Sequence, residues 1–160
     1  MERRELLKIA AVAATAGRLV EAQGQHKFFS AEEFAAVDEL MEIIIPTDDH
    51  SPGARAAQCA AYVDERLAEE PDAKVKDSWR AGIKRVDELS KSMNGEPFMA
   101  ATPAGQTAVV ERMSTQEKFF GLVKEATIHA YYTSKIGIHQ EMEYKGNVLL
   151  NQFVGTELPS

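Results

Sequence analysis

Apolar residues recur at steps of three and four along most of the chain, which is the spacing of one face of an α-helix. The first such face consists of Phe34, Val37, Leu40, Met41, Ile44 and Ile45. Ser30 and Glu33 match a capping box at its start, and Pro46 follows its end. Phe29 and Phe34 are placed for a hydrophobic staple over the first turn. The pattern predicts a buried amphipathic helix between Ser30 and Pro46.

Start and stop signals predict two more helices in the next part of the chain. The second begins at Ala54, and its many alanines would let another backbone come close. The pair Pro71-Asp72 opens the third, which ends at the pair Asn94-Gly95. Their apolar positions are Ala57, Ala60, Val63 and Leu67, and then Val75, Trp79, Ile83 or Gly82, Val86 and Leu89.

Two helices complete the pattern. Thr102 followed by Pro103 opens a short fourth helix. Ser114 and Glu117 match a second capping box, which predicts a fifth helix to about Tyr132. Their apolar positions are Val109, Val110 and Met113, and then Phe119, Phe120, Leu122, Val123, Ala126 and Ala130. Because no stretch alternates apolar and polar residues over strand length, we predict an all-α fold, an irregular bundle of about five helices.

The segment after about residue 133 differs from these helices. It is rich in aromatic residues and glycines and has little regular period. Such a segment usually lies extended over its own domain or over a partner. We therefore expect a single helical domain over residues 26–160 that ends in an extended, Tyr-rich tail.

Residues 1–25 have the pattern of a leader segment. Arg3 and Arg4 are adjacent, Leu6 and Leu7 follow, and a weakly apolar run covers residues 9–17. This run is shorter than the about 20 apolar residues that cross a membrane. The pattern predicts a twin-arginine export signal, a type that carries folded proteins to the periplasm.

Three details bear on this interpretation of the leader. Small residues before Gln23 would permit cleavage there, whereas Glu2 and Arg18 depart from the usual export pattern. A retained leader that anchors the protein therefore stays open. The alternative is a cytosolic amphipathic helix that happens to start with two arginines.

Composition and charge exclude several classes of function. The 160 residues are 44% hydrophobic and 27% charged, which suits one globular domain. The net charge of −7, with no basic cluster beyond the leader, argues against nucleic-acid binding. The single cysteine, Cys59, excludes an internal disulfide framework, and its alanine neighbours indicate a buried, inert thiol.

Candidate chemistry is sparse. Two groups have the chemistry of metal ligands, namely Asp48, Asp49 and His50 in one loop, and His139, Glu141 and Glu143 in the tail. A solvated acidic loop and hydrogen-bonded histidines explain them more simply, and His129 is expected among core positions of the fifth helix. No phosphate-binding loop, dinucleotide fingerprint or nucleophile elbow occurs. This favours an accessory role over catalysis.

Two motifs, in their order and spacing, resemble a known family. The first is Ile44-Ile45-Pro46-Thr47-Asp48 followed by Ser51-Pro52-Gly53-Ala54; the second is Tyr131-Tyr132-Thr133-Ser134 with Gly137, then Tyr144-Lys145-Gly146-Asn147. Over roughly residues 28–155 the chain resembles the gluconate 2-dehydrogenase small-subunit family, also called subunit 3 or gamma.

The resemblance implies a non-catalytic small subunit of a periplasmic FAD-dependent sugar or sugar-acid dehydrogenase. In such complexes a large flavoprotein of the glucose–methanol–choline oxidoreductase type holds the FAD and the substrate, and a cytochrome c subunit often takes the electrons onward. The small subunit is thought to help the flavoprotein fold and to carry it through the twin-arginine pathway. We accordingly expect no cofactor, metal or transmembrane segment in this chain.

The same resemblance suggests which residues meet the flavoprotein. They are Pro46, Asp48, Pro52, Gly53, Tyr131, Tyr132, Gly137, Tyr144 and Gly146. For the tyrosines, the alternative is that they simply cover the fifth helix. Two other functions stay open, a stand-alone periplasmic protein that binds a metal or ligand, and a cytosolic helical enzyme in which Asp48, His50 and His139 converge. Association with a membrane through the complex is a further possibility.

Overall fold

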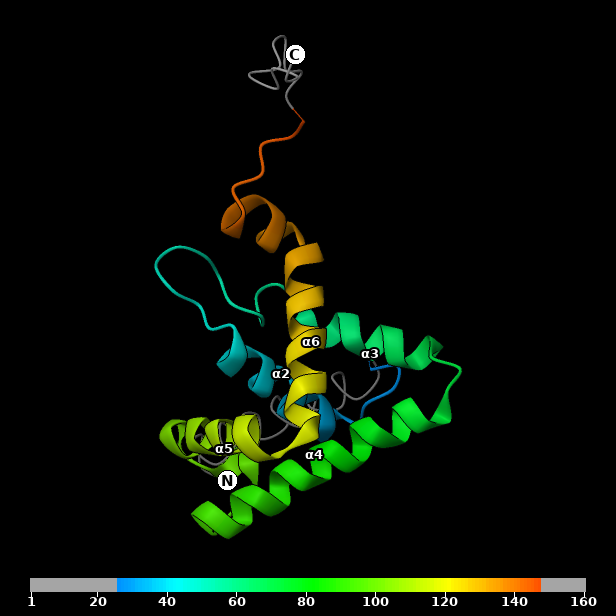
Figure 1. The fold of residues 1–160 in the computed structure, drawn as a ribbon, viewed down its shortest axis with the longest axis vertical. Coiled ribbons are helices and arrows are strands. Elements are labelled where there is room, and N and C mark those ends of the chain that lie inside the picture. Colours follow the sequence, from blue (N-terminus) through cyan, green and yellow to red (C-terminus); the bar gives the residue numbers. More distant parts are fainter. Residues whose placement is uncertain (1–25, 148–160) are drawn as a thin grey trace, which may run out of the picture.

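The computed structural model describes residues 26–147, and helices make up most of this part of the chain (Figure 1). The elements are α2 (Ala31–Ile44), α3 (Cys59–Glu69), α4 (Ala73–Asn94), the 3-10 helix η1 (Phe98–Ala100), α5 (Pro103–Gln116), α6 (Lys118–Thr133) and the π-helix η2 (Gly137–Glu141). Residues 26–147 contain no strand. The predicted all-α class with five longer helices is confirmed.

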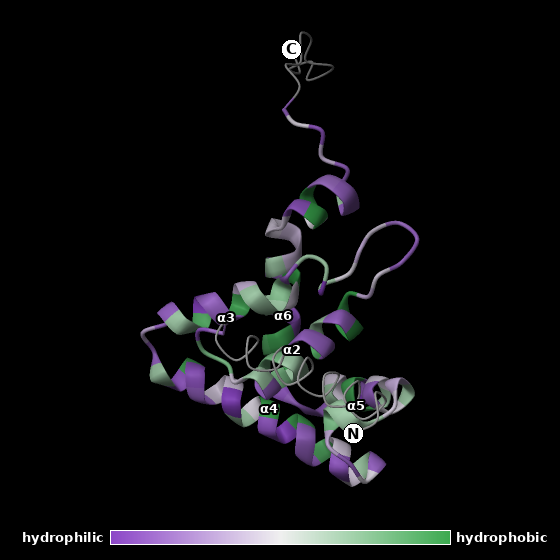
Figure 2. Ribbon diagram, turned by 180° about the vertical axis from the view of Figure 1, so that it is seen from behind, coloured by the Kyte–Doolittle hydropathy of each residue, from purple (hydrophilic) through white to green (hydrophobic). Residues whose placement is uncertain are grey.

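Helix α2 lies at the centre of the bundle and contacts α3, α4, α5 and α6. Helix α6 crosses it, α4 runs along the base, and η2 continues beyond the end of α6 (Figure 1). Figure 2 shows hydrophilic residues along most of α4, as expected for a helix with one face in solvent. Within residues 26–147, no helix has the length and apolar character needed to cross a membrane.

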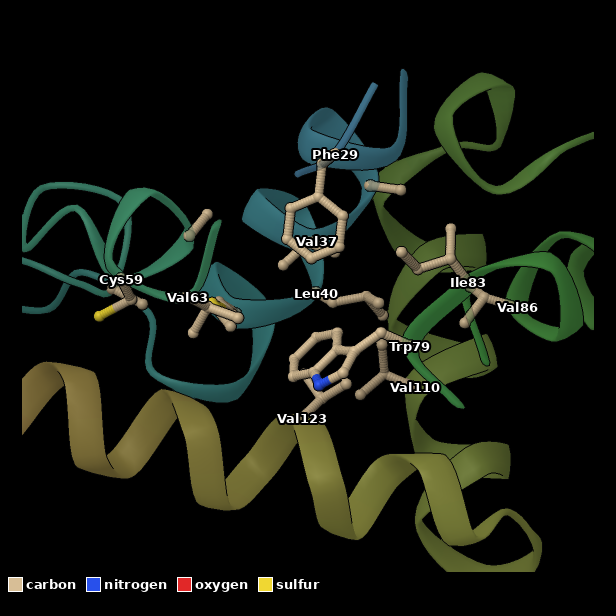
Figure 3. Packing of buried hydrophobic residues seen from close by; sticks show 14 of the residues in the cluster. Phe29, Val37, Leu40, Cys59, Val63, Trp79, Ile83, Val86, Val110 and Val123 are labelled. Atoms are coloured by element: carbon tan, nitrogen blue, oxygen red, sulfur yellow. The ribbon is translucent and has the colours of Figure 1, made fainter. Parts of the chain in front are cut away.

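The core draws on the apolar positions that the periodicity predicted. Figure 3 shows Val37 and Leu40 of α2 surrounded by side chains of the other helices, including Val63, Trp79 and Val123. Trp79 is only 3% exposed, and its ring meets those of Phe29 and Phe119 edge to face. Aromatic pairs in this geometry add stability beyond the area that they bury.

Several predicted helix ends are confirmed in atomic detail. Ser30 Oγ accepts from Glu33 N at 3.1 Å, and Glu33 Oε2 accepts from Ser30 N at 2.9 Å, which completes the capping box. Thr102 Oγ1 caps α5 by accepting from the third backbone amide of that helix at 3.2 Å. Asp72 caps α4, and Gly95 ends it in the left-handed conformation with φ 80°. Each of these signals depends on residues that are close together in the sequence, and the structure forms each one.

The predicted start of the second helix is wrong by five residues. Helix α3 begins at Cys59, because Gln58 adopts a left-handed conformation with φ 58° that an α-helix cannot contain. Residues 54–58 form turns instead, closed by a bond of 3.1 Å from Cys59 N to Ala54 O. Ala54 itself is fully buried, so this turn belongs to the core.

The predicted capping box at the start of the fifth helix is also wrong. Ser114 lies inside α5 and donates to Glu111 O at 2.7 Å, so it does not cap α6. Glu117, its predicted partner, accepts instead from Arg85 Nε at 3.0 Å. At the start of α2, the ring of Phe29 meets that of Trp79 edge to face and the ring of Phe34 stacks on His26, while the predicted staple between the two phenylalanines stays a prediction.

The chain before α2 is held by a buried carboxylate. Asp64 of α3 is 4% exposed, and its two oxygens accept from three successive backbone amides, those of Lys27 at 2.6 Å, Phe28 at 3.0 Å and Phe29 at 2.8 Å. Hydrogen bonds to an ionised acceptor are about twice as strong as neutral ones. Asp64 therefore fixes the point at which the described chain enters the bundle.

The predicted extended tail begins later than expected. Helical turns continue after α6 through η2 to Glu141, and only residues 143–147 lack regular structure and point away from the bundle (Figure 1). Gly137 permits this continuation, because a Cβ there would lie 2.1 Å from Tyr131 O. Residues 148–160 and the leader, with its cleavage position, lie outside the described residues, so these predictions remain predictions.

Two helical glycines provide a matched stability test. A Cβ at Gly82 would meet the ring of Phe119 at 2.1 Å, whereas a Cβ at Gly121 would meet nothing within 4 Å. Gly82→Ala should therefore lower the free energy of unfolding by about 2 kcal/mol through overpacking. Gly121→Ala should raise it by about 0.5–1 kcal/mol, because alanine favours helix. Urea unfolding measures both, and a stabilising Gly82→Ala would contradict this packing.

Candidate functional site

Residues 46–53 form a loop that leaves α2 and returns to the same place. Thr47 Oγ1 donates to Glu42 Oε1 at 3.1 Å and accepts from Gly53 N at 2.8 Å. At its far end, Ala54 N donates to Ile45 O at 2.9 Å. Gly53 has no room for a side chain, since a Cβ would lie 2.5 Å from Thr47 N. The Ile-Pro and Pro-Gly-Ala elements of the sequence motif are thus the two ends of one closed loop.

Asp48 stabilises the tip of this loop. Its Oδ1 accepts from the backbone amides of His50 at 2.8 Å and Ser51 at 2.9 Å, and Asp48 N donates to Ser51 O at 3.1 Å. The hydrogen bond from Ser51, and then that from His50, lowers the pKa of Asp48 from its ordinary value. The carboxylate therefore acts as an acceptor that shapes the loop.

Tyr131 connects this loop to α6. Its side chain is 1% exposed, and its hydroxyl donates to Pro52 O at 2.7 Å and lies 3.0 Å from Ser51 Oγ. Burial raises the pKa of the phenol, which keeps the hydroxyl protonated and able to donate. Because Tyr131 is buried, its ring has an internal role in this chain, in line with the alternative that the tyrosines cover the fifth helix; its part in partner binding stays a prediction.

The π-helix meets the same loop. Ser51 Oγ donates to Glu141 Oε2 at 2.7 Å, while His50 Nε2 lies 3.3 Å from Glu141 O and 3.7 Å from Glu141 Oε2. We call Asp48, His50, Ser51, Tyr131 and Glu141 the loop–tail junction. Through it, one buried phenol and one carboxylate hold the loop, α6 and η2 together.

The predicted partner-binding residues divide into two groups by exposure. Gly53, Tyr131 and Gly137 are buried and Pro52 is half-buried. Exposed are Pro46, Asp48, Tyr132, Tyr144 and Gly146. Tyr132 is 39% exposed and Tyr144 45%, and Met142 between them in sequence is 50% exposed. We call Tyr132, Met142 and Tyr144 together the exposed tail surface.

Sequence reasoning did not predict the roles of three residues of this site, Ser51, Glu141 and Met142. Ser51 and Glu141 form a direct hydrogen bond although they are 90 positions apart, and no local sequence pattern predicts such a pair. Met142 lacked any motif. The aromatic and glycine content of the tail was the available signal. It predicted that the tail contacts the domain, but it did not predict which residue makes the contact.

The candidate metal ligands and catalytic residues do not converge as the metal-binding and enzymatic alternatives require. His50 meets Glu141, while His139 Nδ1 lies 3.2 Å from Tyr144 O. Across the described part of the chain, no three His, Cys, Asp or Glu side chains are arranged to hold a metal ion.

Two other predictions about single residues have different outcomes. His129 is exposed, so its predicted place among core positions is wrong, whereas its hydrogen bond of 3.1 Å with the Tyr62 hydroxyl fits the prediction of a hydrogen-bonded structural histidine. Cys59 is buried as predicted, and burial raises its pKa to about 12, which keeps the thiol protonated and unreactive near neutral pH.

The family model described as gluconate 2-dehydrogenase subunit 3 matches residues 31–148. The chain belongs to this family. The match begins at α2 and continues past the loop–tail junction, so it includes both motifs that suggested the resemblance. The family is named as a subunit of a dehydrogenase, which implies partner subunits. Comparison with curated proteins and with solved structures found no match.

Adjacent tyrosines in this subunit 3 chain test the junction. Tyr131→Phe removes the hydroxyl that donates to Pro52 O and should lower the free energy of unfolding by about 1–2 kcal/mol. Tyr132→Phe, at an exposed position, should change it by less than about 0.5 kcal/mol. Chemical unfolding of both variants measures the difference. Equal stabilities would mean that the junction does not hold the loop.

Proposed function

We propose that this chain is the non-catalytic small subunit of an FAD-dependent sugar or sugar-acid dehydrogenase complex. The observation that carries the proposal is the family match, which extends over residues 31–148. In this proposal the flavoprotein partner supplies the FAD and the oxidation chemistry. The small subunit supports folding, stability and export of that partner, and a cytochrome c subunit takes the electrons onward.

The chemistry of the loop–tail junction supports an accessory role. Asp48 accepts from the backbone of its own loop, Glu141 accepts from Ser51, and Tyr131 donates to Pro52 O. These internal bonds hold the shape of the loop and of the segment after α6. The junction is therefore a device that positions the segments around it.

What the junction positions is the exposed tail surface. Tyr132 follows the buried Tyr131 directly, and Met142 and Tyr144 follow Glu141, so both anchored residues lead into exposed apolar side chains. Tyrosine provides large contact area at low ordering cost and is enriched at interface hot spots. We propose that Tyr132 and Tyr144 anchor the chain on the flavoprotein.

Export completes the proposal. Arg3 and Arg4, followed by Leu6 and Leu7, would direct the chain to the twin-arginine pathway. Because that pathway carries folded proteins, one signal on the small subunit would export both chains if they assemble first. The complex would then work in the periplasm.

Docking predicts a specific loss of co-purification. The double variant Tyr132→Ala with Tyr144→Ala should weaken the complex by at least about 2 kcal/mol, or roughly thirtyfold, if both are hot spots. A chain ending after Met142 should behave similarly and keeps the Ser51–Glu141 bond, unlike a chain ending after Thr133. The readout is flavin absorbance that co-purifies with the tagged small subunit.

The control for docking uses apolar residues that are equally exposed elsewhere. Met93 is 42% and Met99 46% exposed, and neither belongs to the exposed tail surface. Met93→Ala with Met99→Ala should retain the flavoprotein. If the tyrosine variant retained it too, the proposed anchors would be wrong.

Export predicts a change of compartment. Replacing Arg3 and Arg4 together by lysine should stop the chain and its flavoprotein from reaching the periplasm, as measured by fractionation and dehydrogenase activity. Arg18→Lys, which leaves the adjacent arginine pair intact, serves as the matched control. Normal periplasmic activity in the double variant would rule out twin-arginine export.

A further inference from the structure

A second surface remains outside the proposed docking site. It is a groove of about 620 Å³ between α3 and the end of α6. On the α3 side it is lined by Ala57, Ala61 and Tyr62, and on the α6 side by Ala130 and Ile136. The three alanines let another backbone approach closely, while Tyr62 and Ile136 add larger apolar surface. The groove is thus shaped for a segment that is itself poor in large side chains.

The charged residues of the groove have opposite signs on its two sides. Glu65 belongs to α3, and Lys135 follows α6. A segment with one basic and one acidic residue near one end could pair with both of them. An occupant of uniform charge could not.

The described chain enters the bundle beside this groove. His26 and Lys27 line a smaller pocket of about 350 Å³, and Ala61 and Glu65 line both that pocket and the groove. Asp64 holds the backbone of Lys27 there, and the Lys27 ammonium pairs with Glu65. His26, the first residue that the structure describes, therefore lies beside the groove.

The residues that precede His26 have the composition that the groove requires. Residues 9–17 are apolar and mostly alanine, and Arg18 and Glu21 follow. Residues 9–22 would be about 21 Å long as a helix, and the three residues 23–25 could cover about 10 Å between it and His26. A short tether of this kind raises the effective concentration of the segment to about millimolar, so modest contacts suffice for docking.

We propose that residues 9–22 of the same chain dock in the groove between α3 and α6. The alanines of the segment pack against Ala57, Ala61 and Ala130. Arg18 lies beside Glu65, whose carboxylate also pairs with Lys27, and Glu21 pairs with Lys135, which gives a role to an arginine that departs from the usual export pattern. Arg3 and Arg4 precede the docked stretch and remain free, so docking covers the apolar part of the leader without hiding the arginine pair.

Protease sensitivity tests the proposal on the full-length, uncleaved chain. Ala61→Arg places a long charged side chain in the groove, whereas Ala81→Arg makes the same change at an exposed position of α4 that does not line it. Limited trypsin digestion should cut after Arg18 about tenfold faster in Ala61→Arg than in the unchanged chain or in Ala81→Arg. Circular dichroism of the two variants verifies that both fold. Equal rates of cleavage in all three chains would overturn the proposal.

Disulfide trapping identifies the occupant independently of cleavage. Cysteine at Ala10, Ala13 or Ala16, each combined with Thr133→Cys, should form an intramolecular disulfide in at least one pair, detected by peptide mass. The same three combined with Ala81→Cys should not, and Cys59 is too buried to interfere. A disulfide between two molecules would identify a second copy as the occupant. Protection of the groove only in the flavoprotein complex would identify the partner, and either outcome refutes docking of the leader.

Discussion

The burial of α2 is the constraint on which the rest of the structure depends. Val37 and Met41 are fully buried, so the apolar face of this helix must be covered, and α3, α4, α5 and α6 supply the neighbours that cover it. Its two ends are then fixed by polar groups. Asp64 holds the backbone just before it, and the loop after it is closed through Thr47. The apolar face sets the position of α2, and the polar contacts decide where the chain enters and leaves.

The loop–tail junction connects this core to residues at the surface of the molecule. Tyr131 is buried in the core, and its hydroxyl takes part in the loop–tail junction. The position of η2 therefore depends on the same core that holds α2. The exposed tail surface follows from there. One residue, Tyr131, thus joins the core to the segment that carries Met142 and Tyr144.

Sequence reasoning succeeded where the deciding interaction was local. The Ser30–Glu33 box, the Thr102 cap and the glycine at position 95 each depend on residues within four positions. It failed where a valid local pattern met a tertiary constraint. Ser114 and Glu117 fit a capping box, yet α5 continues through Ser114 and Arg85 binds Glu117. Pairs such as Ser51 and Glu141 leave no periodic trace, so only the folded chain reveals them.

The glycines of the two family motifs have an evolutionary consequence. Gly53 and Gly137 are each required because backbone atoms occupy the space of a side chain, and this requirement arises within a single chain. Selection for folding alone would keep both residues, whichever partner the chain binds. The two glycines therefore reflect the demands of the fold, whereas exposed positions such as Tyr132 and Tyr144 can change without disturbing the packing of the backbone.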